Sequence, residues 1–177
     1  MKIAIIGYSG AGKSTLAQKL SQFYSIPKLH MDTLQFQPGW QDSDREWMLG
    51  EVKNFLTKHE AWVIDGNYSW CCYEERMQET DQIIFLNFSP WTCLFRAFKR
   101  YLTYRGKVRE SMAAGCPERF DLEFIRWILW DGRTKNAKER YQRVQENYPE
   151  KVIVLRSQKE MDHFLENLAN NKKNQRA

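Results

Sequence analysis

The segment Gly7-Tyr8-Ser9-Gly10-Ala11-Gly12-Lys13-Ser14 constrains the fold of this chain more than any other feature. It fits the phosphate-binding pattern G-x-x-x-x-G-K-[ST] at every fixed position. Glycines let the backbone curl so that successive N–H groups point at phosphate oxygens, and the next helix adds the positive end of its dipole. The apolar run at residues 3–6 predicts the strand that precedes such a loop. The segment therefore predicts a nucleotide triphosphate site.

Different residues of this loop are expected to hold different parts of ATP and Mg²⁺. The backbone of the loop is expected to contact the phosphates at Gly7, Gly10, Ala11 and Gly12. Lys13 is the catalytic candidate that bridges the β- and γ-phosphates, and the Ser14 hydroxyl is expected to join the Mg²⁺ shell.

The composition predicts one globular domain. The chain has 177 residues, of which 42% are hydrophobic, and no stretch of eighteen apolar residues occurs in it. We expect a single domain over residues 1–169, a flexible polar tail over 170–177, a cytoplasmic location and no membrane partner. The four cysteines form no C-x-x-C pair, so we expect reduced thiols and neither a zinc site nor a disulfide framework.

Five apolar runs alternate with segments that have helix signals, which is the rhythm of an α/β sheet. The predicted strands are residues 3–6, 26–31, 61–64, 83–86 and 152–155. Capping boxes and an N-cap followed by proline predict helices near 44–59, 158–169 and 90–104. A long helical stretch over 121–147 is expected to kink or split at Asp131-Gly132.

Two acids follow predicted strands at the edge of the sheet where ligands bind. Asp65 is expected to hold Mg²⁺ or its waters, and Asp32 is expected to act on the hydroxyl of a phosphoryl acceptor as a catalytic and substrate-binding residue. A turn or helix cap is the structural alternative for each acid. We interpret His30 as a half-buried packing residue.

Positive charge is concentrated in one region. Residues 96–143 contain thirteen Lys and Arg against six Asp and Glu, although the whole chain has a net charge of only +5. Within this region the glycines and proline of residues 105–120 predict a mobile lid that delivers arginines to the phosphates. The catalytic candidates are Arg105 and Arg109, and the further phosphate candidates are Arg96, Arg100, Arg119, Arg126 and Arg133.

The acceptor side of the site has its own candidates. Arg45, Arg76 and Tyr68 are expected to contact the acceptor. Three aromatic residues near the ends of the second and third strands could stack on an acceptor base or sugar, with ordinary packing as the alternative: Trp40, Tyr68 and Trp70.

Taken together, these motifs resemble adenylate-kinase-like P-loop kinases, and within them the set named DNA topology modulation proteins. The likeness runs through K-I-A-I-I-G-Y-S-G-A-G-K-S-T-L, L-H-M-D-T-L, W-V-I-D-G-N-Y, D-Q-I-I-F-L, G-C-P-E-R-F-D and K-V-I-V-L-R-S. The resemblance implies a three-layer P-loop fold, an α/β class with a five-stranded parallel sheet in the order 2-3-1-4-5 and a lid. It also implies ATP binding by Gly10, Gly12, Lys13, Ser14 and Thr15.

The resemblance has one departure. Nucleoside monophosphate kinases usually follow the third-strand acid with G-x-P-R, whereas this chain has Asp65-Gly66-Asn67-Tyr68-Ser69. The acceptor is therefore left open between a nucleoside, a nucleotide and another small hydroxylated molecule. The leading hypothesis is an ATP-dependent small-molecule kinase that is a monomer or homodimer. The alternative is an ATP-binding protein associated with nucleic acid, which the basic region favours but no DNA-binding motif supports.

Overall fold

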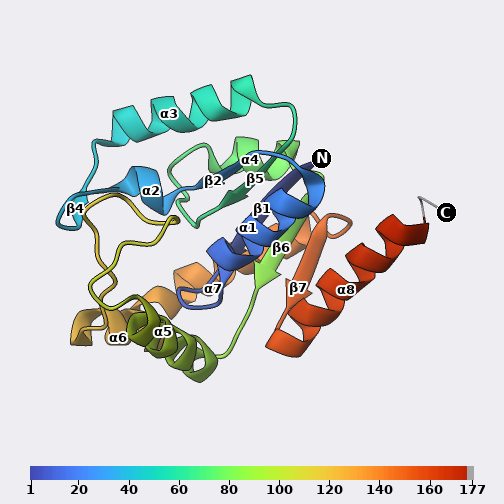
Figure 1. The fold of residues 1–177 in the computed structure, drawn as a ribbon. Helices are drawn as coiled ribbons and strands as arrows, with labels where there is room; N and C mark the ends of the chain where they lie inside the picture. Colours follow the sequence, from blue (N-terminus) through green and yellow to red (C-terminus); the bar gives the residue numbers. More distant parts are fainter. Residues whose placement is uncertain (175–177) are drawn as a thin grey trace.

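The structure is a computed structural model that describes residues 1–174. Its centre is a parallel sheet of five strands (Figure 1): β1 (Lys2–Gly7), β2 (Lys28–His30), β5 (Trp62–Asp65), β6 (Gln82–Leu86) and β7 (Val152–Leu155). The spatial order is β2-β5-β1-β6-β7. Numbered along the chain within this sheet, that is the order 2-3-1-4-5, so the expected α/β class is confirmed. Because β1 is the middle strand, the phosphate-binding loop lies at the centre of the sheet edge.

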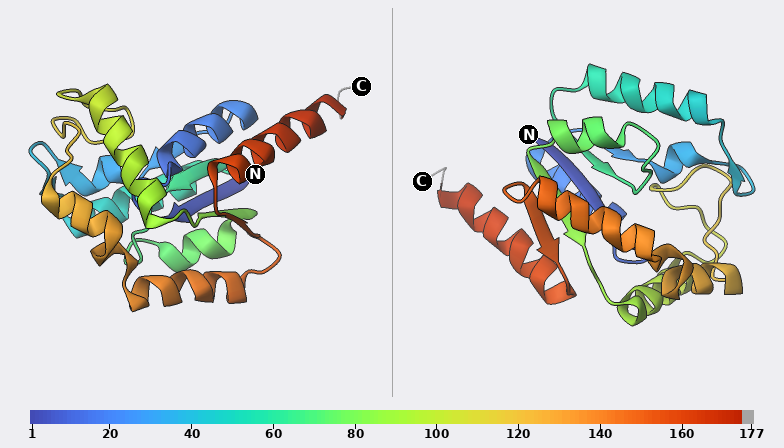
Figure 2. Two further views of the ribbon diagram at one scale, coloured as in Figure 1. Left: turned by 90° about the horizontal axis from the view of Figure 1, so that it is seen from below. Right: turned by 180° about the vertical axis from the view of Figure 1, so that it is seen from behind.

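Helices cover both faces of this sheet. Figure 2 shows α1 (Lys13–Tyr24) and α8 (Gln158–Asn174) on one face, with α4 (Tyr73–Glu79) and α7 (Lys135–Asn147) on the other. This three-layer arrangement explains why the strands are continuous apolar runs rather than alternating ones. Helix α8 continues past the predicted end at residue 169, so residues 170–174 of the expected tail are helical, and residues 175–177 lie outside the described residues.

The predicted helix starts agree with the structure to within a residue or two. Helix α3 (Arg45–Lys58) is capped by Asp44, whose carboxylate accepts a hydrogen bond from the Trp47 N–H at 2.8 Å. Helix α5 (Pro90–Tyr104) begins after the Ser89 cap. The long stretch after residue 121 splits as expected, into α6 (Leu122–Leu129), a short 3-10 turn (Asp131–Arg133) and α7.

One small substructure was not predicted. Asp32 begins the short helix α2 (Asp32–Gln35), which leads into an antiparallel pair of strands, β3 (Phe36–Gln37) and β4 (Gln41–Asp42). Each of these strands is two residues long, which is too short for alternation of apolar and polar residues to reveal. In Figure 1 the hairpin lies beyond α2, at the side of the molecule away from α8, and it forms a sheet separate from the main one.

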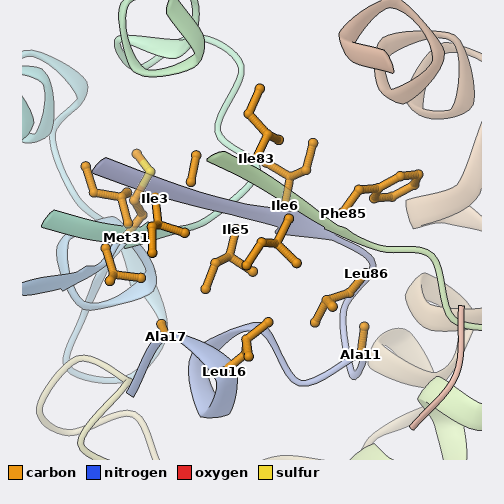
Figure 3. Packing of buried hydrophobic residues seen from close by; sticks show 14 of the residues in the cluster. Ile3, Ile5, Ile6, Ala11, Leu16, Ala17, Met31, Ile83, Phe85 and Leu86 are labelled. Atoms are coloured by element: carbon orange, nitrogen blue, oxygen red, sulfur yellow. The ribbon is translucent and has the colours of Figure 1, made fainter. Parts of the chain in front are cut away.

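The main hydrophobic core lies between the sheet and its helices. Figure 3 shows Ile3 and Ile5 of β1 on the side of the sheet where Leu16 and Ala17 of α1 lie, and all four side chains are buried. This packing fixes the start of α1 relative to the end of β1, and therefore fixes the loop between them. Within residues 1–174, no helix combines the length and the apolar character needed to cross a membrane.

Candidate functional site

Glycines allow the loop between β1 and α1 to follow a path closed to other residues. Gly7 has φ of 137° and Gly10 has φ of 82°. A Cβ atom on Gly7 would collide with the Leu86 carbonyl oxygen, and one on Gly10 would lie 2.5 Å from the Cys93 carbonyl oxygen. Because these neighbours are backbone atoms, they cannot move aside cheaply. The loop therefore lies directly against the end of β6 and the first turn of α5.

Side chains from two other elements fasten the loop. The Asn67 amide accepts a hydrogen bond from the Gly7 N–H at 3.0 Å and donates one to the Gly7 carbonyl at 2.5 Å. The Tyr8 ring is buried and packs edge-on against Tyr141 of α7 at 5.2 Å between ring centroids. The Ala11 N–H donates to the Tyr8 carbonyl at 3.1 Å, so this amide is already used inside the loop. These contacts fix the shape of the loop.

Lys13 lies across the loop that contains it. Its Nζ atom donates to the Gly7 carbonyl at 2.9 Å and to the Tyr8 carbonyl at 3.2 Å. Burial lowers the pKa of the Lys13 ammonium below its ordinary value, while the charges of Asp32 and Asp65 oppose that change. A partly buried cation whose hydrogen bonds within residues 1–174 go to two backbone carbonyls is well prepared to exchange them for phosphate oxygens.

Ser14, Asp65 and His30 form a connected group beneath the loop. The Ser14 hydroxyl donates to Asp65 Oδ2 at 2.8 Å, and His30 Nδ1 contacts Asp65 Oδ1. His30 and Asp65 are both buried, with only 6% and 4% of their side-chain surface exposed. The interpretation of His30 as a half-buried packing residue is therefore wrong. Its ring is buried, and it contacts Asp65, the acid expected at the metal site.

The oxygen atoms of Ser14 and Asp65 fit the requirements of Mg²⁺. Mg²⁺ prefers hard oxygen ligands, and it commonly takes one or two from the protein while keeping waters and phosphate oxygens. Within residues 1–174 no group of three or more His, Cys, Asp or Glu side chains is placed to hold a metal ion. Ser14 and Asp65 would supply two oxygen ligands of this kind.

A tyrosine of the loop after β5 orients Asp32. The Tyr68 hydroxyl donates to Asp32 Oδ1 at 2.7 Å. Burial raises the pKa of Tyr68 far above its ordinary value, and the Asp32 charge raises it further. The hydroxyl therefore stays protonated and orients the carboxylate. Within residues 1–174 the Asp32 Oδ2 atom makes no hydrogen bond, so this oxygen is available to a hydroxyl of a ligand.

A cleft of about 1230 Å³ opens beside the loop. Its walls come from the loop itself, α2, the β3–β4 hairpin, the segment after β5, α5, residues 105–120 and the helices that follow. Eight of the expected site residues line it: Gly10, Gly12, Lys13, Ser14, Thr15, Asp32, Tyr68 and Arg109. Gly7, Ala11 and Asp65 lie beneath its surface instead. The structure thus brings the loop and both expected acids to one site.

Arginines of α5 and the following loop line the cleft opposite the phosphate-binding loop. Arg96 lies against Gly12 and contacts Gln158 of α8. Arg100 and Arg109 share the buried carboxylate of Glu118, which accepts from their Nε atoms at 2.7 and 2.5 Å. Burial is the largest cause that lowers the pKa of Arg100 from its ordinary value. Arg100 and Arg109 were both expected to contact phosphate, but no sequence pattern indicated that they share the carboxylate of Glu118.

The expected lid has contacts of its own. Met112, Ala113 and Cys116 form a small buried cluster against Phe36 and Trp40 of the β3–β4 hairpin. This cluster is separate from the main core, so it ties residues 105–120 to the hairpin rather than to the sheet. The hydrophobic residues that make it were not recognised in the sequence as a packing unit.

Several expected arginine roles are not supported by the placement of the side chains. Arg76 is 1% exposed and donates to the Gly66 and Tyr68 carbonyls, so it supports the loop after β5 from behind and does not line the cleft. Arg105 is exposed outside the cleft. Arg45 is also outside its lining, although its guanidinium lies 5.2 Å from the ring of Trp70.

Two later arginines also serve structure. Arg126 pairs with Asp131 at the surface at 2.9 Å. Arg133 donates to the Ile128 and Phe88 carbonyls and lies over the Tyr8 ring at 3.7 Å. Arg133 therefore braces the loop through Tyr8 and does not line the cleft.

Comparisons with known proteins give matches by structure only. No protein-family model matches this chain, and no curated protein matches its sequence. A structure of deoxyadenosine kinase from M. mycoides, with the products dCMP and a flexible dCDP bound, matches with a TM-score of 0.56 at 18% identity, covering 98% of this chain and 100% of that chain. A gluconokinase from Sinorhizobium meliloti 1021 matches with a TM-score of 0.51 at 18% identity, covering 98% and 96%.

A second structure of the M. mycoides deoxyadenosine kinase, with bound dATP, matches over 98% of this chain and 100% of that chain, with a TM-score of 0.53 and 18% identity. The matched kinases act on acceptors as different as a nucleoside and a sugar acid, so the shared fold does not choose between them. The comparisons establish that this chain has the fold of the P-loop kinases.

Proposed function

We propose that this protein is a phosphotransferase that moves the γ-phosphate of ATP, in the presence of Mg²⁺, to a hydroxyl group of a small molecule. The observation that carries this proposal is the meeting of the phosphate-binding loop with Asp32 in one cleft, with Asp65 directly beneath the loop. A protein that only binds nucleotide needs no carboxylate with an open oxygen facing the site. A kinase needs one to accept the proton of the attacking hydroxyl.

Each group has a distinct role in this proposal. Lys13 would exchange its two carbonyl partners for phosphate oxygens. Ser14 and Asp65 would hold Mg²⁺, which supplies charge neutralisation to the phosphates when it is bound. Arg100 and Arg109 line the opposite wall, where their charges would stabilise the negative charge on the transferred group. Asp32 would accept the proton of the acceptor.

A Lys13→Ala variant tests the nucleotide part of this proposal. Titration calorimetry with ATP and Mg²⁺ should give at least a tenfold loss of affinity, while the midpoint of thermal unfolding stays close to that of the unsubstituted protein. Lys19→Ala is the matched control, because Lys19 is an exposed lysine of the same helix and lies outside the cleft. Equal ATP affinity in all three proteins would contradict the assignment of the loop.

Association with nucleic acid is the second candidate function, and it includes the finer resemblance to DNA topology modulation proteins. The specific observation in its favour is the exposed surface of α5, where Trp91 and Phe95 are 70% and 69% exposed near Lys99. Exposed rings beside positive charges can bind single strands by stacking and phosphate contact. Binding to single-stranded DNA that weakens steeply with salt would support this candidate, and absence of binding at low salt would remove it.

A further inference from the structure

We propose that the phosphoryl acceptor is a nucleoside, whose base lies among four aromatic side chains at one end of the cleft and whose hydroxyl meets Asp32. The four are Phe36, Trp40, Tyr68 and Trp70, and all of them line the cleft. This inference rests on the proposed kinase function and adds the chemical class of its second substrate.

The four rings come from two separate segments that line the same cleft. Phe36 and Trp40 belong to the β3–β4 hairpin, with ring centroids 5.2 Å apart, and Tyr68 and Trp70 belong to the segment after β5, with centroids 6.4 Å apart. Trp70 is 37% exposed. Flat apolar surfaces that remain accessible in a polar cleft suit a flat heteroaromatic ligand, because stacking removes both surfaces from water.

The rings lie next to the expected catalytic acid. Tyr68 belongs to the aromatic group and donates to Asp32 Oδ1 at 2.7 Å. Asp32 in turn begins α2, the short helix that ends at Gln35, immediately before Phe36. A molecule that stacks on these rings would therefore place an attached sugar hydroxyl near Asp32, between the base and the phosphate-binding loop.

Gln35 adds a polar contact suited to the edge of a base. Its Nε2 atom donates to Asp42 Oδ1 at 2.8 Å. Because an ionised carboxylate can only accept, this bond fixes which end of the amide is the oxygen. The Gln35 Oε1 atom is buried and has no hydrogen-bond partner within residues 1–174. A ring N–H or amino group of a base is the donor that this atom lacks.

Two other acceptor classes fit these walls less well. A sugar acid has no flat apolar face, so it would gain no stacking on the rings that line the cleft while its hydroxyls lost water. A nucleoside monophosphate needs cations for its phosphate, but Arg76 is buried behind the loop and Arg45 lies outside the lining. Arg119 and Arg140 do line the cleft, so the monophosphate is the alternative that the experiment must separate.

The reaction that follows from this placement is balanced. The nucleoside hydroxyl oxygen forms a bond to the γ-phosphorus of ATP, and the bond from that phosphorus to the bridging oxygen of the β-phosphate breaks. ADP leaves with the electron pair of the broken bond. The hydroxyl proton passes to the open carboxylate oxygen of Asp32. The products are ADP and a nucleoside monophosphate.

The test is a panel of acceptors with purified full-length protein, ATP and Mg²⁺. The panel contains the common ribo- and deoxyribonucleosides, their 5′-monophosphates, gluconate and shikimate. ADP release gives the rate, and mass spectrometry identifies the phosphorylated product. At least one nucleoside should be converted to its monophosphate, at least tenfold faster at equal concentration than any monophosphate or sugar acid.

Two tryptophan variants connect the activity to the aromatic end of the cleft. Trp70→Leu should raise the KM for the preferred nucleoside by about tenfold, the effect of losing one base–aromatic stack, with kcat and the affinity for ATP little changed. Trp91→Leu is the matched control, since this ring is 70% exposed on α5 and does not line the cleft. Phe36→Leu provides a second test should Trp70→Leu fold poorly.

The outcomes separate this inference from the function on which it rests. Conversion of a monophosphate or a sugar acid without conversion of any nucleoside overturns the nucleoside proposal and leaves the kinase proposal standing. ATP binding by calorimetry with neither turnover nor binding of any nucleoside overturns the nucleoside proposal as well. Absence of ATP binding overturns both. An equal rise of KM in Trp70→Leu and Trp91→Leu would contradict the placement of the base.

Discussion

His30 and Asp65 are partners in register on the neighbouring strands β2 and β5, and His30 Nδ1 contacts Asp65 Oδ1 where both strands end. The other oxygen of Asp65 accepts from Ser14 at 2.8 Å. Both oxygens of this buried acid are therefore oriented by residues from different elements. Groups that orient a metal-binding carboxylate usually affect metal affinity almost as much as the ligand itself.

We predict that His30→Leu raises the Mg²⁺ concentration needed for half-maximal ATP binding by about tenfold or more, because Asp65 loses the partner of its Oδ1 atom. Calorimetric titrations of ATP at a series of Mg²⁺ concentrations measure this change. His30→Asn is the matched variant, since its amide nitrogen can take the place of Nδ1, and it should recover most of the affinity. An unchanged Mg²⁺ requirement in His30→Leu would mean that the histidine serves packing alone.

Asp32→Asn should lower kcat by about 10²-fold or more and leave ATP affinity nearly unchanged, because the amide cannot accept a proton during transfer. Steady-state kinetics with the acceptor identified by the panel give kcat, and calorimetry gives the ATP affinity. Asp131→Asn is the control, as Asp131 lines the same cleft but pairs with Arg126. A loss of ATP affinity without a loss of kcat would remove Asp32 from the acceptor side.

Sequence patterns identified the parts of this site that depend on local chain order. The phosphate-binding loop and the acid at the end of β5 follow directly from neighbouring residues, and so did the split of the helix at Asp131. The role of His30 depends on which strand lies beside β2, and one sequence does not give that register. Alternation along a strand places a side chain on a face, but it does not name the residue opposite.

Buried charges were the hardest features to predict. An arginine after a strand was expected to face a ligand, but Arg76 is surrounded by protein because the loop after β5 turns its carbonyls toward it. In the same way, Glu118 is a charged residue in a predicted lid, where a solvated side chain is expected. In the structure it is buried between two arginines. Such partners come together only when distant segments pack, so no local pattern records them.

Alkaline pH should destabilise the protein through Tyr68. Its pKa is raised in the folded state, by burial first and by Asp32 second, from an ordinary value of 10.0. Its full contribution to stability is present below pH 10, and it is lost as pH rises because the unfolded tyrosine ionises while the folded one does not. The free energy of unfolding should fall by about 1.4 kcal/mol for each pH unit above 10 from this group alone.

Urea unfolding between pH 7 and pH 11 measures this loss. Tyr68→Phe should lose stability less steeply above pH 10 than the unsubstituted protein, with the difference in slope near the value for one proton. Tyr104→Phe, which alters a ring at the surface of α5, should follow the unsubstituted protein. Parallel pH profiles for all three proteins would contradict the assignment of this loss to Tyr68.

Glu118 should control the order of residues 105–120. Its carboxylate, with 3% of the side-chain surface exposed, lies between Arg100 and Arg109, and its charge offsets the repulsion of two cations that line the cleft. Glu118→Gln removes that charge and leaves the arginines to repel each other, at a cost of about 1–3 kcal/mol. Amide hydrogen exchange across residues 105–120 should therefore become about tenfold faster or more in the free protein, while β1 stays protected.

An ATP analogue with Mg²⁺ should restore much of the protection, because phosphate oxygens supply the missing negative charge between the same two arginines. Glu110→Gln is the control within the same loop, since Glu110 pairs with Lys28 at the surface with 75% of its side chain exposed. If exchange in Glu118→Gln matched that of Glu110→Gln, with and without nucleotide, the loop would be held by its Met112 cluster alone and the arginines would not respond to phosphate.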